Sequence, residues 1–337
     1  MQQGSCIKTS PTSWLVLLMV LLCLGAGTAS AGQTVTYRLK WVANMSTVGD
    51  VYARDHGFFA KEELSVEIKP GGPEHDAVRE LELGYADFGV ASADQVIRAV
   101  DKGAPLVVLA QFFRRNPLHW IYRSDKLSIE KPRDLLGKSI GVTFGKNDEI
   151  IMRTLLVEAG IKENQVRLFS VRLDYTPFYK GEVDLWPVYI NTQGVEIGSR
   201  MRSAGEQVAF LKPDRFNVRF VANSLITSQR IWTEQPDLVA RFVRSLLAGW
   251  QASLQPDNAA KALATVANYD RDASPAVLSA QLEATRDVAL PENGGPFGTI
   301  DTEAWRQTEK IMLDYHQIEQ PVDIVRYLKA LPKGKDK

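Results

Sequence analysis

Cysteine is nearly absent from this sequence of 337 residues, and its two cysteines, Cys6 and Cys23, both lie close to the N-terminus. The rest of the chain therefore has no disulfide, no thiol nucleophile and no cysteine metal site. The histidines are also few and scattered, without metal-ligand spacing: His56, His75, His119 and His316. A G-x-S-x-G nucleophile elbow and a P-loop are both missing. These absences disfavour an enzyme and predict neither a metal nor a cofactor.

An excess of charge of either sign is lacking as well, because 40 Lys and Arg residues face 40 Asp and Glu residues. Such a balance gives no electrostatic footprint for nucleic acid or for an anionic membrane surface. We therefore expect a small molecule, not a nucleic acid, as the ligand. A chain of this length can bury a full core and usually divides into two domains.

Long apolar runs are missing except for one, Trp14–Leu24. Lys8 precedes it as the only charged residue before position 38, and small residues ending in Ala29–Ala31 follow it. This order is typical of a secretory signal peptide over residues 1–31, cleaved after Ala31. A membrane anchor would need about 20 apolar residues. Lipid attachment at Cys23 is disfavoured by the bulky Leu22 before it, so a soluble periplasmic protein is expected.

Short β-rich runs alternate with amphipathic helical patterns in the first part of the remaining chain. Alternation of this kind predicts βαβ units and a mainly parallel sheet covered on both faces. The expected strands are Tyr37–Val42, Val66–Ile68, Phe88–Ala91 and Leu106–Gln111. The expected helices are Val48–Glu63, Asp76–Leu83 and Asp94–Lys102.

The same pattern then restarts, which indicates a second α/β unit. Its expected strands are Ser139–Val142, Val166–Val171 and Asp184–Tyr189, with a helix at Asp148–Ala159 that Gly160 ends. From Ile231 onward the chain reads as helical, with amphipathic stretches at Pro236–Trp250, Asn258–Ala267 and Thr302–Tyr315. The sequence thus predicts two α/β lobes followed by helices.

Three segments together carry a resemblance to a known family. The first begins Leu39-x-Trp41-x-x-Asn44 and continues to His56-Gly57-Phe58-Phe59. The second runs from Pro70-Gly71-Gly72-Pro73 to Ala91-Ser92-Ala93-Asp94-Gln95, and the third is Pro132-x-Asp134-Leu135-x-Gly137-Lys138-x-Ile140-Gly141-Val142. In combination they resemble the periplasmic binding proteins of the NMT1/THI5-like group, which are related to nitrate, sulfonate and taurine receptors.

The resemblance implies a type II periplasmic binding fold, in which two lobes close on a small molecule and deliver it to a permease. Lobe 1 would comprise residues 32–121 plus 220–337, and lobe 2 residues 122–219, with two crossing strands as the hinge. An ABC permease with its ATPase would be the partner of a monomeric receptor. Members most similar to the stretch that ends in Gln95 bind aminopyrimidines related to thiamine.

Loops beyond the carboxyl ends of the strands are the candidate site, because ligands of open α/β sheets bind there. Trp41 could stack on a flat ring or simply pack in its lobe, and Asn44 offers a donor and an acceptor. Gly71 and Gly72 would let the backbone approach a ligand or form an ordinary turn. The full set of expected ligand contacts is Trp41, Asn44, Asp50, Gly71, Gly72, Ser92, Ala93, Asp94, Asp148, Glu149, Trp186, Tyr189, Asn191 and Gln193.

Two groups of candidate residues, Ser92–Asp94 and Asn147–Glu149, each lie between an expected strand and the helix that follows it. Ser92 or Asp94 could cap the helix after Phe88–Ala91, with Ala93 between them, while its N–H groups face the cleft. In the second lobe, either Asn147 caps the helix or Asp148 and Glu149 contact the ligand.

Carboxylates outnumber cations in the candidate loops, where Arg114 and Arg115 are the clearest positive charges. This favours an amino-substituted heterocycle over a sulfonate or nitrate, because a ring with N–H donors suits carboxylates and amides. The family pattern for pyrimidine binders is altered here at Ala43, Thr47, Val51 and Gln193. A different flat ring, such as a pyrimidine variant or a flavin-like ring, is therefore an open alternative.

A second class, pyrimidine synthases that use pyridoxal phosphate, belongs to the same fold group. The resemblance implies that their lysine and histidine would fall at Ala91 and Gln95 of this chain, and their cysteines within Val218–Thr227, which has none. A Schiff base needs the lysine amine. The enzyme alternative is therefore disfavoured, and we expect a receptor that releases its ligand unchanged.

Overall fold

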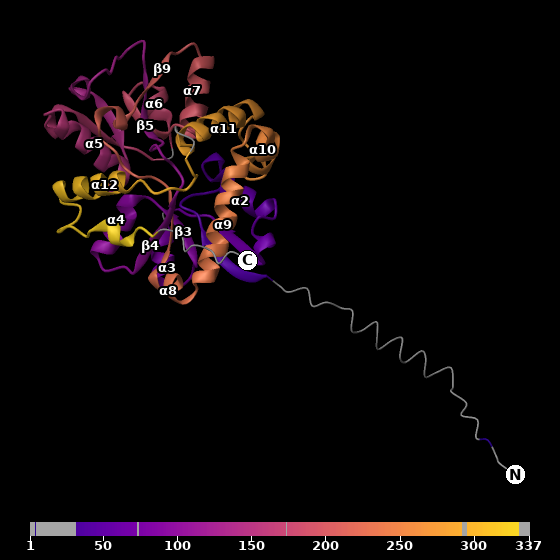
Figure 1. Ribbon diagram of the computed structural model, residues 1–337. Coiled ribbons are helices and arrows are strands. Elements are labelled where there is room, and N and C mark those ends of the chain that lie inside the picture. Colours follow the sequence, from indigo (N-terminus) through magenta and orange to yellow (C-terminus); the bar gives the residue numbers. More distant parts are fainter. Residues whose placement is uncertain (1–3, 5–31, 73, 173, 292–294, 330–337) are drawn as a thin grey trace.

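The computed structural model describes residues 4, 32–72, 74–172, 174–291 and 295–329, and Figure 1 shows two α/β halves joined by connecting segments. The expected signal peptide, residues 1–31, lies outside the described residues apart from Gly4. No helix within the described part of the chain is long and apolar enough to cross a membrane.

Each half is built on one five-stranded sheet. The first sheet has the order β2-β1-β3-β10-β4, with β1 at Gln33–Arg38, β2 at Leu64–Lys69, β3 at Phe88–Ala91, β4 at Leu106–Gln111 and β10 at Ser224–Ser228. β1 is parallel to β2 and β3, whereas β10 is antiparallel to both β3 and β4.

The second sheet repeats this arrangement. Its order is β7-β6-β8-β5-β9, with β5 at Leu118–Arg123, β6 at Ser139–Val142, β7 at Arg167–Ser170, β8 at Leu185–Tyr189 and β9 at Val208–Leu211. β5 is antiparallel to β8 and β9, and the other pairs are parallel. In both sheets the antiparallel strand is the first one formed after the chain crosses from the other half.

Helices cover the sheets and continue after β10. The α-helices are α2 (Val48–Asp55), α3 (Ala77–Leu83), α4 (Ala93–Asp101), α5 (Asn147–Glu158), α6 (Thr176–Tyr179), α7 (Gln193–Ser203), α8 (Gln229–Glu234), α9 (Pro236–Ser253), α10 (Ala259–Ala267), α11 (Pro275–Ala289) and α12 (Thr302–Asp314). Short 3-10 turns add η1 (Met45–Thr47), η2 (Ala60–Glu62), η3 (Pro132–Leu135), η4 (Glu163–Gln165), η5 (Pro213–Phe216), η6 (Pro256–Asn258) and η7 (Ile324–Tyr327).

Two of the expected elements differ from the structure by the most residues. The strand expected at Tyr37–Val42 lies earlier, because β1 pairs with β2 only as far as Arg38 and the chain then turns past Gly71. The helix expected at Val48–Glu63 ends at Asp55, since Gly57 has a positive φ of 75° that a helix cannot continue through.

The positions where the chain passes from one sheet to the other can be compared with the expected lobe boundaries. The chain leaves the first sheet after Gln111 and joins the second at Leu118; it leaves the second after Leu211 and returns at Ser224. A boundary at residue 122 would cut β5, so we place the first change of sheet between Gln111 and Leu118. The lobe boundaries as domain limits stay a prediction.

The two connecting segments run next to each other. The backbone N–H of Phe112 donates to Asn223 O at 3.0 Å, and the side-chain amide of Asn116 donates to Phe220 O at 3.0 Å. The Asn116 oxygen also accepts from the N–H of Leu118, the first residue of β5. These bonds tie the outgoing and returning segments together between the sheets.

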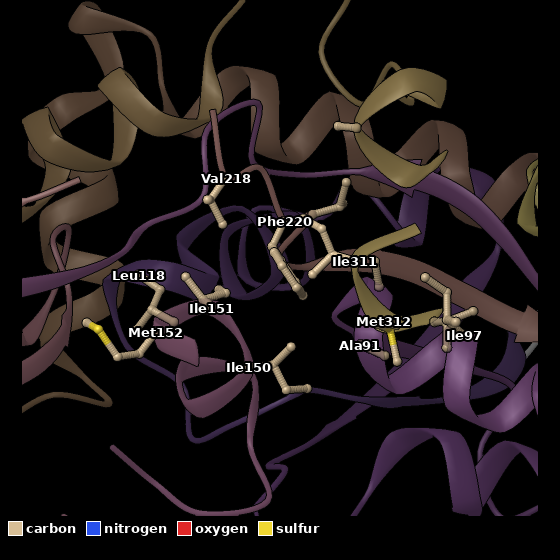
Figure 2. Packing of buried hydrophobic residues seen from close by; sticks show 14 of the residues in the cluster. Ala91, Ile97, Leu118, Ile150, Ile151, Met152, Val218, Phe220, Ile311 and Met312 are labelled. Carbon is tan, nitrogen blue, oxygen red and sulfur yellow. The ribbon is translucent and has the colours of Figure 1, made fainter. Parts of the chain in front are cut away.

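One hydrophobic cluster extends from the first half through the connecting segments into the second. Figure 2 shows Phe220 and Val218 of the returning segment between Ile150 and Ile151 of α5 and Ile311 of α12, all of which belong to this cluster. Two further clusters fill the other side of each sheet. Continuous apolar packing through the connecting segments limits how freely the halves can move relative to each other.

The C-terminal segment is held by one carboxylate. Glu309 on α12 is 9% exposed and accepts hydrogen bonds from the backbone N–H groups of Val322, Asp323 and Ile324, at 2.7, 2.8 and 3.0 Å. Hydrogen bonds to a charged group contribute more than neutral ones. This carboxylate therefore fixes the chain where it turns back toward the first sheet.

Glu309→Gln replaces one acceptor oxygen by an NH₂ group that faces backbone donors. We expect the free energy of unfolding to fall by about 1–3 kcal/mol, as for a lost hydrogen bond to a buried charged group, measured by urea denaturation. Glu303→Gln on the same helix is the matched control, because the Glu303 side chain is 78% exposed, and a change within about 0.5 kcal/mol is expected. Equal losses in the two variants would contradict the role of Glu309.

Candidate ligand-binding cleft

The carboxyl ends of parallel strands from both sheets lead into one cavity of about 560 Å³. The first half contributes the loops after β1, β2 and β3, and the second contributes the loop after β6 with the start of α5. Residues that line the cavity include Lys40, Trp41, Gly72, Ser92, Asp94, Gly145, Lys146 and Asn147. This is the location expected for a ligand of open α/β sheets.

Trp41 offers a flat apolar surface to this cavity. It lies in the loop after β1, is 40% exposed and lines the cavity. Asn44 caps the following turn η1, where its oxygen accepts from the N–H of Ser46 at 2.8 Å. The Asn44 carbonyl is thus already engaged, whereas the Trp41 ring has room for a partner.

Gly71 and Gly72 follow β2 and have different surroundings. A Cβ on Gly71 would lie 2.0 Å from Leu39 O, so glycine is required there for close packing against the loop after β1. The N–H of Gly71 also donates to Trp41 O at 3.1 Å. Gly72 lines the cavity. Gly71 therefore positions the Trp41 loop, and Gly72 is the residue of this pair that faces the cavity.

Ser92, Ala93 and Asp94 begin α4, and the polar groups of this helix end are largely engaged within the protein. Ser92 is the N-cap residue, and its hydroxyl donates to the Asp94 carboxylate at 2.6 Å. Arg98 also donates to this carboxylate, at 2.6 Å, and the N–H of Ala93 donates to Val221 O at 3.1 Å. The helix end is therefore linked to the returning hinge segment.

The start of α5 has a similar internal arrangement. Lys146, not Asn147, occupies the N-cap position, so the capping role considered for Asn147 is wrong. Asp148 accepts from the N–H of Thr143 at 2.6 Å, and Glu149 accepts from the N–H of Gly145 at 2.6 Å. Burial raises the pKa of Asp148 to about 6, and the hydrogen bond from Thr143 only partly opposes it.

Lys40 is a cavity residue that the sequence did not point out. Its Nζ donates to the Tyr189 hydroxyl at 3.2 Å and lies 5.8 Å from the centre of the Tyr189 ring. Burial lowers the pKa of Lys40, but Tyr189, Asp94 and Asp148 outweigh this effect, and the pKa is raised. Lys40 belongs to the first half and Tyr189 to the second, so this bond spans the two.

Asn191 and Gln193, which follow β8, join parts of the protein to each other. Asn191 is fully buried, and its amide donates to the hydroxyls of Ser46 at 3.2 Å and Thr285 at 3.1 Å. The Gln193 oxygen accepts from the Thr192 hydroxyl at 2.7 Å. Asn191 thus connects the second half to η1 and to α11 of the C-terminal region.

Asp50 and Trp186 lie inside the halves, away from the Trp41 cavity. Asp50 is 1% exposed on α2, and its carboxyl accepts from the Tyr37 hydroxyl at 2.5 Å. Trp186 is 1% exposed on β8 and packs against Phe178 with ring centres 6.2 Å apart. Neither lines the cavity, so we leave both out of the site proposed below. The cavity lining also does not include the expected contacts Asn44, Gly71, Ala93, Asp148, Glu149, Tyr189, Asn191 and Gln193.

The cations that the sequence placed among the candidate loops lie elsewhere. Arg114 and Arg115 line a second cavity of about 460 Å³ together with Asp214 and Asp301, on the connecting segments. Their positive charge is therefore not available to the Trp41 cavity, which is lined by other cations: Lys40, Arg79, Arg98, Lys102 and Lys146.

Residues 44–259 match the family described as NMT1/THI5 like. The chain belongs to the NMT1/THI5-like family. This match covers the second sheet and all of the first except β1, and it includes the loops after β2, β3 and β6 that line the cavity. The family expected from the sequence motifs is thus confirmed.

Curated relatives of this family member include both binding proteins and an enzyme. The chain is 26% identical over 92% of its length to the formylaminopyrimidine-binding protein of Halalkalibacterium halodurans, 94% of which is covered. It is 24% identical over 87% of its length to the riboflavin-binding protein RibY of Chloroflexus aurantiacus, with 84% covered. It is also 26% identical, over 66% of its length, to the 4-amino-5-hydroxymethyl-2-methylpyrimidine phosphate synthase of Legionella pneumophila, with 69% covered.

Solved structures confirm the fold. The periplasmic aliphatic sulphonate binding protein SsuA of Escherichia coli superposes with a TM-score of 0.69 at 16% identity, covering 91% of this chain and 94% of that one. The family member therefore has the periplasmic binding protein fold that the sequence predicted.

The buried Asp50 carboxyl generates a pH-dependent prediction. Burial raises its pKa from 3.8 to about 7, although the hydrogen bond from Tyr37 opposes this. The folded protein thus keeps a proton on Asp50 that the unfolded chain releases near its ordinary pKa. The stability that this proton provides is complete below about pH 4 and is lost as the pH rises through about 7.

Asp50→Asn removes this titration. The native protein loses stability as the pH rises, and the variant does not. The free energy of unfolding of the variant minus that of the native protein should therefore increase by roughly 1.4 kcal/mol per pH unit from pH 4 to 7 and then level off. Urea denaturation at a series of pH values measures it. A difference that does not change with pH would mean that Asp50 is ionised throughout.

Proposed function

We propose that this chain is the solute-binding component of an ABC importer and that it binds a small flat heterocycle in the cavity beside Trp41. The observation that carries the proposal is the exposed Trp41 ring in a cavity lined by loops from both sheets. Aminopyrimidines are the first candidates, given the formylaminopyrimidine-binding relative. A flavin-like ring is the second, given the riboflavin-binding relative.

Hydrogen bonding around the cavity supports a ring over a sulfonate or nitrate. An anion at the start of a helix needs N–H donors that are not already used. Here the N–H of Ala93 is bonded to Val221, and those of Thr143 and Gly145 are bonded to carboxylates. The carboxylates of Asp94 and Asp148 would also repel an anion. An alkyl sulfonate or nitrate is therefore the runner-up.

A receptor without catalytic activity is the function we favour over a pyrimidine synthase. At the synthase positions for lysine and histidine this chain has Ala91, which is fully buried at the end of β3, and Gln95, whose side chain accepts from the N–H of Ser92. Ala91 cannot form a Schiff base with pyridoxal phosphate. The pyrimidine synthase relative shares the family, but these positions do not support its chemistry.

In the proposed role the protein works outside the cytoplasm as a monomer. Residues 1–31 have the order of a cleaved secretory signal, and the fold is that of periplasmic binding proteins. Its macromolecular partner would be a permease with its ATPase. Closure of the halves on the ligand is favoured only as far as the ligand contacts the closed form better.

Trp41→Ala tests the ring-stacking site. In thermal-shift scans of the exported protein, an aminopyrimidine or riboflavin should raise the melting temperature of the native protein. We expect Trp41→Ala to weaken binding by about tenfold or more, since stacking on an aromatic side chain contributes about 1–3 kcal/mol. Tyr85→Ala is the control, because Tyr85 is 67% exposed outside the cavity. If only an alkyl sulfonate or nitrate raises the melting temperature, the proposed receptor function would stand and the proposed heterocyclic ligand would be wrong.

The export prediction has its own measurement. Expression of the full sequence in a Gram-negative host, followed by N-terminal analysis of the periplasmic protein, should give a chain that begins at Gly32. Ala31→Arg removes the small residue expected before the cleavage point and should leave the protein uncleaved. A native protein that keeps residues 1–31 would contradict the cleaved signal.

A further inference from the structure

Lys40, which lines the cavity beside Trp41, connects the two halves. It lies on the loop after β1 in the first half, and its ammonium donates to the hydroxyl of Tyr189, at the end of β8 in the second half, at 3.2 Å. Both Lys40 and Trp41 line the cavity. A ligand stacked on Trp41 would therefore lie next to this ammonium group.

The carboxylates that attract Lys40 are engaged with other groups. Asp94 accepts from Ser92 and Arg98, and Asp148 accepts from the N–H of Thr143. Among the residues that the structure describes, Lys40 forms no ion pair within 4.0 Å. Its charge is thus stabilised from a distance and not by a direct carboxylate contact.

An ammonium group has three N–H donors, and the described residues accept from one of them, through Tyr189. A partly buried charged donor is costly when no acceptor is near. The remaining donors of Lys40 therefore favour a ligand that presents lone pairs in the cavity.

We propose that Lys40 is a specificity-determining residue whose ammonium donates a hydrogen bond to a carbonyl oxygen carried by the bound heterocycle. This inference rests on the proposed function, because it names the ligand atom that the same cavity selects. A neutral acceptor fits better than a full anion beside Lys40, since the nearby carboxylates of Asp94 and Asp148 disfavour an anion. A ligand with an ammonium group at that position is repelled by Lys40.

Two related ligands test the role of Lys40: formylaminopyrimidine, which has a carbonyl oxygen, and its deformylated amine, which has an ammonium group instead. Isothermal titration calorimetry gives their dissociation constants for the native protein, Lys40→Met, Lys40→Gln and the control Lys126→Met. Lys126 is exposed in the turn after β5 and does not line the cavity, so its replacement removes one positive charge elsewhere.

We expect the native protein and Lys126→Met to bind the formyl ligand at least tenfold more tightly than the amine. Lys40→Met should lose about tenfold or more in affinity for the formyl ligand, as for a hydrogen bond to a charged group, and should lose the preference over the amine. Lys40→Gln keeps an uncharged NH₂ donor group and should be intermediate. Where riboflavin is the ligand that binds, the same loss in Lys40→Met is expected, because its ring carries carbonyl oxygens.

An unchanged ratio of the two affinities in Lys40→Met and Lys40→Gln would overturn the role of Lys40 and leave the proposed function in place. Absence of binding of all three compounds to the native protein would overturn the proposed function and the role of Lys40 with it. The melting temperatures of the unliganded variants separate a loss of recognition from a loss of folding.

Discussion

The arrangement of both sheets depends on two neighbouring chain segments that connect them, Phe112–Pro117 and Lys212–Asn223. They are joined by backbone and side-chain hydrogen bonds from Phe112 and Asn116, and they carry the chain once in each direction between the sheets. The strand that follows each crossing enters its sheet antiparallel to its neighbours. The parallel strands of both sheets can then direct their carboxyl ends toward one shared cavity.

Most polar groups described near that cavity form hydrogen bonds within the protein. Ser92, Asp94, Asp148 and Glu149 hold the starts of α4 and α5, while Asn191 joins β8 to η1 and α11. These bonds preorganise the walls, and preorganised sites lose less free energy on binding. The Trp41 ring and the Lys40 ammonium are the groups that we assign to the ligand, and together they favour a flat neutral molecule with one well-placed acceptor.

The strands that the sequence predicted best are short, apolar and fully buried. Phe88–Ala91, Leu106–Gln111 and Ser139–Val142 have the same bounds in the structure, because strands buried on both faces read as continuous apolar runs. The sequence did not predict β5, β9 and β10. β5 mixes His119 and Arg123 with apolar residues, and its polar side chains are buried by contacts with distant segments that a local pattern cannot reveal.

The candidate site was predictable where residue type alone carries chemistry, as for Trp41 and Asp94, and less so elsewhere. Lys40 was missed because it fell within the strand expected at Tyr37–Val42, where a lysine normally faces solvent. Asp50 and Trp186 were included because the sequence cannot tell which face of α2 or β8 turns inward. Only the packing around Tyr37 and Phe178 decides this.

The position of β10 between β3 and β4 has a consequence for how the chain matures. Five strands of the second sheet are synthesised before Ser224–Ser228, so that sheet can assemble while the first is still missing a central strand. Until β10 arrives, β3 and β4 each have an open edge, and open edges pair readily with other chains. The half that bears Trp41 and Lys40 therefore cannot complete its sheet until residue 228 has been made.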